Sequence, residues 1–346
     1  MNHHYMLPLK QQACRGREVV FYDQVGAGES AQPPDPRRSA PWLFEIDYYV
    51  EELSELITAL GWREFHFLGN SWGTIVGQAY ALAQDPRLRA VVLSGPLSDA
   101  QLYVRSQWDE EEGNLGSLPP FVQATLRRLQ DLEAFTSPLY AAEDSVLTSF
   151  FTVRTTPLPD CVKKGVNLSN TSREIYVGMQ GASEFVIGGV LATFNFTPRL
   201  HEIRNPVLLT HGRYDTMRPP VVDVMYRTLP LAWRALLPHS GHMSMIDDPR
   251  LMNDIVGSFL QHEERGTLAQ FAVPGAASEE PVQCSPLGPS AVLAEAPSAS
   301  PPWLPAVVSA VASAGVGAAV ASAVMLRHIV PRLQGRQVFS APPLLS

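Results

Sequence analysis

Short apolar runs alternate with segments of helical periodicity along residues 18–260, and this alternation constrains the fold more than any other feature of the 346-residue chain. Residues 46–60 place apolar side chains at helical spacing and stop at Gly61, and residues 74–84 follow the same pattern. Strands that alternate with helices predict a mostly parallel sheet covered on both faces, so the predicted class is α/β. The runs expected as strands are residues 18–22, 65–68, 90–94, 207–210 and 235–237.

The alternation is interrupted between Gly95 and about Gly189, where the pattern becomes helical and irregular. We expect an inserted helical cap there. The expected division is a first core part (1–96), a cap (97–189) and a second core part (190–263).

The composition changes after the predicted core. Eight prolines lie between Pro274 and Pro305 among Ala, Ser and Gly. Such a segment buries too little apolar surface to offset chain entropy, which predicts a disordered linker over 264–305. Residues 306–330 are expected to form an Ala/Val-rich apolar helix. Its length fits a membrane anchor, but its Ala, Ser and Gly content favours a tail that does not insert.

Charge and cysteine content exclude several classes of protein. The net charge of -8 and the pI near 5.6 argue against a nucleic-acid partner, which requires a basic face. Cys14, Cys161 and Cys284 form no C-x-x-C pair, which excludes a zinc ribbon or disulfide framework and suits a reducing compartment. No metal-ligand spacing and no signal peptide are visible, so we expect no metal, no cofactor and a cytoplasmic location.

The strongest local motif is Gly69-Asn70-Ser71-Trp72-Gly73, between a predicted strand and a predicted helix. This is the context of a G-x-S-x-G nucleophile elbow, in which the turn exposes the serine hydroxyl at the sheet edge. The backbone N–H of Trp72, at a helix N-terminus, is positioned to stabilise an oxyanion. Ser71 is therefore the candidate nucleophile.

A serine nucleophile needs a base and a group that orients the base. Asp215 follows the strand that ends at Thr210, which places it at the same sheet edge as the elbow. Asp247 and Asp248 are alternatives, although their position before Pro249 is typical of a helix start.

The candidate base is His242, which follows the last predicted strand and Gly241. His239 is the competing histidine. His66, inside a predicted strand, is interpreted as a packed side chain.

The motifs together resemble the proline iminopeptidases, serine aminopeptidases of the α/β-hydrolase superfamily. The resemblance covers about residues 5–262. It rests on residues 23–30 (DQVGAGES), the elbow, residues 181–185 (GASEF), residues 212–215 (GRYD) and Gly241-His242.

This resemblance implies an α/β-hydrolase fold and an enzyme that releases an N-terminal residue, preferably proline, through a Ser71–His242–Asp215 triad. It implies that Glu184 binds the free ammonium of a peptide or amino-acid amide. Relatives often carry a second acid directly after the triad aspartate, where this chain has Thr216. Amidase or carboxylesterase activity on the same triad is therefore the alternative.

A second departure lies at the start of the sequence. Relatives have a strand and an H-G-G-P-G loop, which supplies the second oxyanion donor, before the segment that matches residues 5–9. The sequence begins after that loop, so we expect a central strand to be missing between residues 18–22 and 65–68. A catalytically impaired, truncated remnant is the further alternative.

Overall fold

The computed structural model describes residues 2–30, 32–165, 173–274 and 323–328. Its centre is a six-stranded sheet in the order β1-β6-β2-β3-β4-β5. Strands β2 to β5 run parallel, whereas β6 pairs antiparallel with both β1 and β2. The mostly parallel sheet predicted from the sequence is confirmed. The strands are β1 (Arg17–Tyr22), β2 (Phe65–Asn70), β3 (Leu88–Ser94), β4 (Val207–Gly212), β5 (Ala232–Leu237) and β6 (Ala323–His328).

Each face of the sheet has its own apolar core, because successive strand residues point to opposite faces. Phe67 and Val91 belong to one core, and Leu68 and Val92 belong to the other. The first core is covered by α2 (Ile46–Ala59), α3 (Trp72–Leu82) and α9 (Pro219–Thr228). The second is covered by the 3-10 helix η1 (His3–Arg15) and by α11 (Pro249–Glu264).

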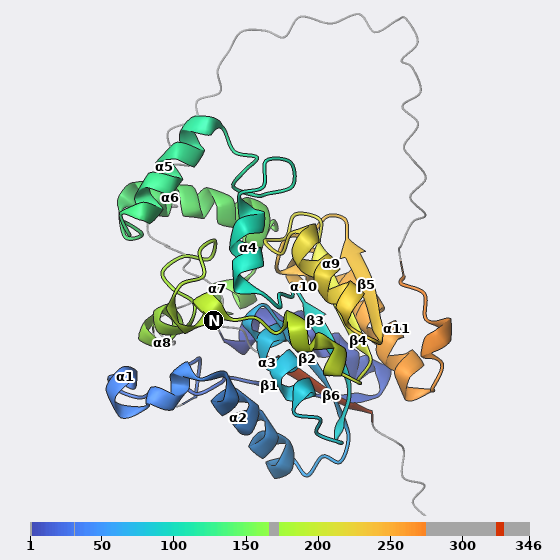
Figure 1. Cartoon of the computed structure of the whole chain (residues 1–346). Helices are drawn as coiled ribbons and strands as arrows, with labels where there is room; N and C mark the ends of the chain where they lie inside the picture. The colour runs from blue at the N-terminus through green and yellow to red at the C-terminus, as the bar shows by residue number, and fades with distance from the viewer. Residues whose placement is uncertain (1, 31, 166–172, 275–322, 329–346) are drawn as a thin grey trace, which may run out of the picture.

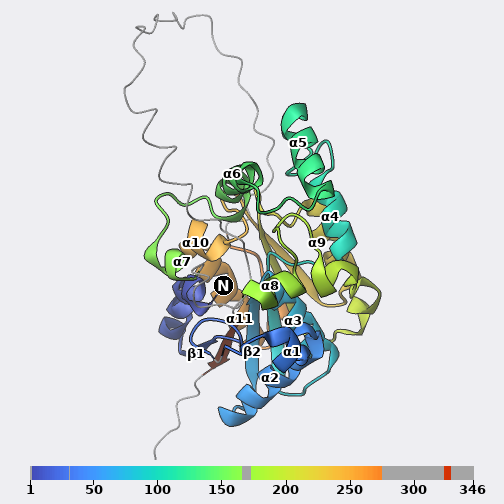
Figure 2. The ribbon, with the colours of Figure 1, turned by 90° about the vertical axis from the view of Figure 1, so that its left-hand side faces the viewer.

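A group of helices between β3 and β4 forms a lid. Figures 1 and 2 show α5 and α6 projecting away from the sheet, beyond α4. The lid has a small core of its own that includes Leu126, Tyr140 and Phe185. Its helical elements are α4 (Ala100–Gln107), α5 (Pro120–Asp131), α6 (Pro138–Leu147), the π-helical turn η3 (Thr148–Thr152), α7 (Asp160–Gly165) and α8 (Arg173–Met179).

Strand β6, red in Figure 1, occupies the position between β1 and β2 that was expected to lack a strand. Met325 belongs to one core, Val324 and Leu326 belong to the other, and all three are fully buried. The expected helix over 306–330 is therefore wrong for residues 323–328. Those residues gain more as a strand, because it bonds to two neighbours and buries both of its faces. The rest of that segment lies outside the described residues.

The disordered linker expected over 264–305 is wrong for its first residues, 264–274, which the structure describes as part of the folded body. Residues 268–270 form a 3-10 turn, and Phe271 is buried with its ring centroid 5.5 Å from that of Phe259. Residues 275–305 lie outside the described part. The remaining short elements are α1 (Pro36–Ser39), η2 (Pro41–Phe44), η5 (Gly189–Thr193), η6 (Thr197–Glu202) and α10 (Ser244–Asp247).

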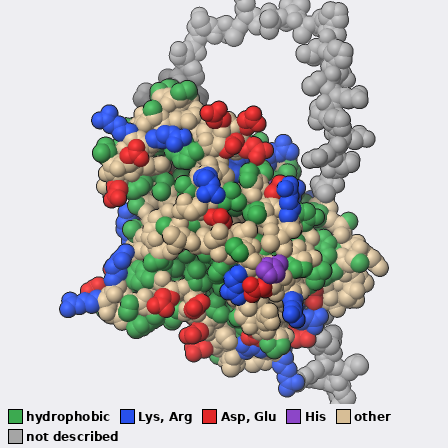
Figure 3. All heavy atoms as spheres, viewed as in Figure 1, with side chains coloured by type: hydrophobic (Ala, Val, Ile, Leu, Met, Phe, Trp, Pro, Cys, Tyr) green, Lys and Arg blue, Asp and Glu red, His purple; other side chains and the backbone are tan. Residues whose placement is uncertain are grey.

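Acidic and basic side chains are intermixed on the face shown in Figure 3, where the described residues form no continuous basic surface. None of the helices in the described ranges combines the length and the apolarity that a bilayer span needs.

Candidate active site

The nucleophile elbow predicted at Ser71 adopts a strained turn between β2 and α3. Ser71 has φ 55 and ψ -119, a region that non-glycine residues occupy at a cost of about 1–3 kcal/mol. A Cβ atom on Gly69 would lie 2.2 Å from the backbone oxygen of Gly73. Only glycine therefore allows the strand and the helix to approach this closely, and the turn holds Ser71 at the carboxyl edge of the sheet.

His242 and Asp215 form a buried pair at the same edge. Nδ1 of His242 lies 2.7 Å from Oδ1 of Asp215, and both residues have no solvent exposure. The turn after β4 fixes the carboxylate, because Met217 donates its backbone N–H to Oδ1 at 2.9 Å and Gly212 donates to Oδ2 at 3.3 Å. The carboxylate therefore presents a fixed acceptor to the imidazole.

The charges of this pair stabilise each other. Burial opposes ionisation of Asp215, but His242 and the Met217 N–H lower the pKa of Asp215 below its usual value. Burial also opposes protonation of His242, yet the charge of Asp215, with a further contribution from Glu184, raises the pKa of the imidazole above its usual value. Nε2 of His242 is buried and has no hydrogen-bond partner among the described residues.

Two contacts position the His242 loop against the elbow. The side-chain amide of Asn70 donates to the backbone oxygen of His242 at 3.2 Å. Gly95, which follows β3 with φ +58, lies so close to the imidazole that a Cβ atom there would be 2.5 Å from Cε1 of His242. No sequence pattern singled out either residue for this role, although Gly95 directly follows one predicted strand and Asn70 lies two residues after another.

A small cavity contains Ser71. Its volume is about 20 Å³, which is room for about one water molecule. The elbow, helix α3, the loops after β3 and β4, and the segment between them in the chain contribute to its walls. The lining residues are Ser71, Trp72, Ile75, Leu97, Tyr103, Gln180, Glu184, Ile187, Leu191 and Met217.

Glu184 is a buried carboxylate in the wall of this cavity, with only 5% of its surface exposed. The hydroxyl of Tyr176 donates to its Oε2 at 3.4 Å, and the hydroxyl of Tyr103 donates to its backbone oxygen at 2.8 Å. Burial, followed by the charge of Glu184, raises the pKa of both tyrosines well above its usual value. Both phenols therefore remain protonated donors beside Glu184.

The alternative site residues are either exposed or held in structural contacts. His239 is exposed. Asp247 accepts the backbone N–H groups of Gly241 and Thr155 at 2.8 and 2.9 Å, which joins the His242 loop to the lid. Asp248 caps α11. Thr216, fully buried, directs its hydroxyl to Oδ1 of Asp215 at 3.4 Å.

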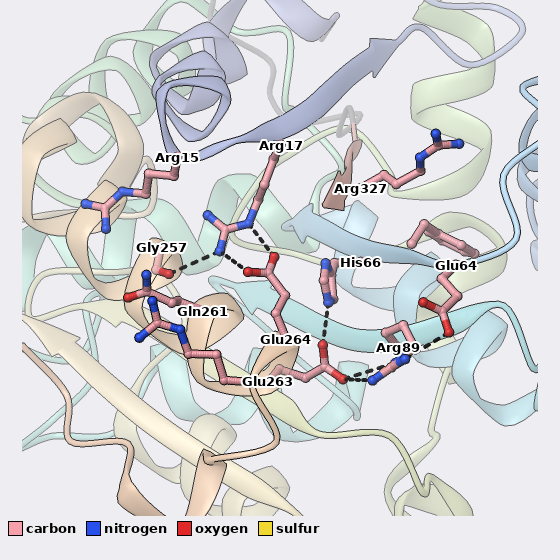
Figure 4. A pocket seen from close by; sticks show the side chains of 12 residues that line it. Arg15, Arg17, Glu64, His66, Arg89, Gly257, Gln261, Glu263, Glu264 and Arg327 are labelled. Atoms are coloured by element: carbon pink, nitrogen blue, oxygen red, sulfur yellow. Dashed lines mark hydrogen bonds and ion pairs between the residues drawn. The ribbon is translucent and has the colours of Figure 1, made fainter. Parts of the chain in front are cut away.

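A larger cavity of about 520 Å³ lies at the opposite edge, where β2 and β3 begin (Figure 4). Several of its charged groups pair with one another: Arg17 bonds to Glu264 at 2.7 Å, and Glu263 accepts from Arg89 at 2.9 Å and contacts His66 at 2.7 Å. His66 is thus packed against a partner, as predicted. Because neither Ser71 nor Glu184 lines this cavity, we place the candidate active site in the smaller one. No group of three or more potential metal ligands occurs within the described ranges.

Comparison with known proteins identifies the family of the chain. Residues 1–249 match the family model of the alpha/beta hydrolase fold, so the chain is an enzyme of the α/β-hydrolase class. It is 33% identical over 255 residues to the proline iminopeptidase of Heyndrickxia coagulans, which covers 74% of this chain and 85% of the relative. It is 31% identical over 254 residues to that of Clostridioides difficile, with 71% and 81% covered. The chain belongs to the proline iminopeptidase family.

Two solved structures share the fold. The proline iminopeptidase of Mycobacterium smegmatis has a TM-score of 0.68 at 24% identity, with 77% of this chain and 87% of that chain covered. VinJ has a TM-score of 0.69 at 22% identity, with 76% and 86% covered. The predicted α/β-hydrolase fold is confirmed.

Proposed function

We propose that this enzyme releases an N-terminal residue, preferably proline, from peptides by a serine acyl-enzyme mechanism. The observation that carries the proposal is that Ser71 and the buried carboxylate of Glu184 line the same cavity. A nucleophile close to a buried carboxylate suits a substrate whose scissile carbonyl lies one residue from a free ammonium group. The relatives named proline iminopeptidase support proline as the preferred residue.

In this mechanism Ser71 attacks the scissile carbonyl while Nε2 of His242 takes the hydroxyl proton. Nε2 is available for that proton because no described residue bonds to it. Asp215 fixes the imidazole tautomer through Nδ1 and stabilises the imidazolium. His242 then gives the proton to the leaving amine, and water hydrolyses the acyl-enzyme by the same route.

The backbone N–H of Trp72, at the start of α3, is assigned as a hydrogen-bond donor to the oxyanion of the tetrahedral intermediate. The helix N-terminus favours negative charge at this point. Because the cavity has room for about one water molecule, substrate binding requires movement of residues in its walls, such as Ile187 and Leu191. The lid would then exclude water from the acyl-enzyme until the amine product leaves.

The experiment compares prolyl p-nitroanilide with p-nitrophenyl acetate, an ester that lacks the amine. Ser71→Ala should abolish hydrolysis of both substrates and labelling by a fluorophosphonate probe. Glu184→Gln should lower kcat/KM for the anilide at least tenfold, because it removes one member of a buried charge pair, and should leave the ester nearly unchanged.

Equal labelling of wild type and Ser71→Ala would refute the assignment of Ser71 as the nucleophile. A uniform loss on both substrates in Glu184→Gln would assign Glu184 to lid structure. Turnover of the ester by wild type without turnover of the anilide would favour a carboxylesterase on the same triad.

A further inference from the structure

Asp247, in the short helix α10, is a carboxylate that the proposed mechanism does not use. Its Oδ2 accepts the backbone N–H of Gly241, the residue directly before His242, at 2.8 Å. Its Oδ1 accepts the backbone N–H groups of Arg154 and Thr155 and the hydroxyl of Thr155, each at 2.9 Å. One carboxylate therefore connects the loop of the proposed base to the segment that follows η3 in the lid.

Two backbone hydrogen bonds hold the same loop against the π-helical turn η3 itself. His242 donates its N–H to the backbone oxygen of Phe151 at 2.9 Å, and Met243 donates to that of Thr152 at 2.8 Å. A Cβ atom on Gly241 would lie only 2.8 Å from the oxygen of Phe151. π-helical turns are rare and occur frequently at functional sites. The backbone of the proposed base is thus bonded directly to the lid.

The same lid segment also contacts the loop that carries Asp215. The guanidinium carbon of Arg154 lies 3.8 Å from the centroid of the Tyr214 ring, a cation–π contact, and Tyr214 directly precedes Asp215. The backbone N–H of Tyr214 donates to the oxygen of Ser240 at 3.0 Å, which joins the loop of the acid to the loop of the base. Both loops therefore lie against lid residues 151–155.

A base accepts the serine proton efficiently only when its nitrogen is held in place, because a displacement of about 1 Å can cost about 10²-fold in rate. Hydrogen bonds to a charged acceptor are about twice as strong as those to a neutral acceptor, so a carboxylate suits this position. We propose that Asp247 is a positioning residue that holds the His242 loop against lid residues 151–155, so that the base is in its catalytic place only while this segment is docked. The inference rests on the role of His242 in the proposed function.

The inference also locates the movement that substrate binding requires. The cavity that contains Ser71 is lined by Ile187 and Leu191 and by none of residues 151–155. Movement of those two wall residues can admit a substrate while residues 151–155 stay docked and the base stays in place. Release of residues 151–155 would instead remove the support of the His242 loop.

The test compares Asp247→Asn with Asp248→Ala in the full chain. Asn matches Asp in size but has one acceptor oxygen, and its amide group would face N–H donors. Asp247→Asn should lower kcat for prolyl p-nitroanilide at least tenfold with little change in KM. It should slow p-nitrophenyl acetate hydrolysis and fluorophosphonate labelling by a similar factor, because His242 serves each of these reactions.

Asp248→Ala is the matched control at the neighbouring position. It removes the side chain that caps α11, where Oδ1 accepts the N–H of Leu251 at 3.1 Å. Loss of this cap should lower the melting temperature by a few degrees and preserve kcat. The melting curve of each variant gives its folded fraction at the assay temperature.

Variants of Thr155 test the lid side of the contact. Thr155→Val removes the hydroxyl that bonds to Asp247 and should lower kcat about threefold. Thr155→Ser keeps the hydroxyl and should retain the wild-type kcat. In the Asp247→Ala background, Thr155→Val should lower kcat no further, because the hydroxyl has already lost that acceptor.

The outcomes separate this inference from the proposed function. Unchanged kcat in Asp247→Asn, or a loss that its unfolded fraction accounts for, would overturn the inference and leave the function standing. If wild type does not turn over the anilide, slower ester hydrolysis and labelling in Asp247→Asn would support the inference and refute the peptidase activity. Absence of labelling and of both hydrolyses in wild type would overturn both.

Discussion

The side-chain amide of Asn70 donates to the backbone oxygen of His242 at 3.2 Å and to that of Ser94 at 3.0 Å. One buried amide thereby joins the ends of β2 and β3 to the loop after β5, across 172 residues of sequence. The residue that directly precedes the proposed nucleophile therefore also holds the loop that carries the proposed base. Small changes at these strand ends are therefore expected to affect catalysis more than stability.

We expect His242→Ala to remove nearly all hydrolysis of prolyl p-nitroanilide and His239→Ala to leave most of it, since His239 is exposed. The base must be neutral to accept a proton, so activity falls as the pH drops through its pKa. Asp215 raises that pKa despite burial, which places the acid limb of kcat/KM above about 6.5. Initial rates from pH 5 to pH 9 measure it. A limb below 6.5, or the reverse ranking of the two histidines, would contradict the assignment.

Gly95→Ala should reduce kcat because the new Cβ atom would lie 2.5 Å from Cε1 and Nδ1 of His242. A displacement of the imidazole by about 1 Å is expected to cost about 10²-fold in rate. Gly61→Ala is the control: Gly61 also has a positive φ of +66, but a Cβ atom there meets nothing within 4 Å. Gly61→Ala should lower the melting temperature slightly and preserve kcat. Equal activities of the two variants would show that the imidazole tolerates the contact.

Ionisation of the buried carboxyl of Glu52, on α2, should lower the stability of the protein at neutral and alkaline pH. Its Oε1 accepts the N–H of Val25 at 2.9 Å, but its Oε2 is buried without a recorded partner, and burial raises its pKa from 4.5 to about 7. A carboxyl with a raised folded-state pKa holds its proton more tightly in the folded chain, so stability falls as the pH rises from about 4.5 to 7.

Glu52→Gln should therefore raise the free energy of unfolding by up to about 3 kcal/mol at pH 8 and change it little at pH 4.5. Urea unfolding at both values measures the difference. Glu55→Gln, an exposed position on the same helix, should show no such dependence. A gain that is equal at both pH values would show that ionisation of Glu52 is not its cause.

Leu326→Asp tests strand β6. Leu326 is fully buried between β1 and β2, so an unpaired charge there should cost several kcal/mol and lower the melting temperature by about 10 °C or more. Arg327→Ala, on the same strand, loses a half-exposed contact of 3.9 Å with Glu18 and a contact with the ring of Trp62, 5.9 Å from the centroid. It should cost much less than Leu326→Asp, about 1 kcal/mol. An unchanged melting temperature in Leu326→Asp would show that β6 is not part of the sheet.

Local sequence patterns predicted much of the core. The predicted strand at 90–94 is the end of β3 (Leu88–Ser94), and the predicted helix at 46–60 is α2 (Ile46–Ala59). These elements could be predicted because hydrophobic periodicity and turn residues are local signals, each contained within a short stretch of sequence. The pairing of His242 with Asp215 followed from the same logic, because parallel strands bring their carboxyl ends to one edge.

The sequence by itself determined five of the six strands of the sheet, β1 to β5, the turn that presents Ser71, and the placement of Asp215 and His242 at the same sheet edge. Only the tertiary structure decided that β6 fills the position between β1 and β2, that Asn70 holds His242, and that Tyr103 bonds to the backbone of Glu184. The reason is that these contacts join segments far apart in the chain. Their stability depends on mutual burial and hydrogen bonding, which no local pattern of residue types records.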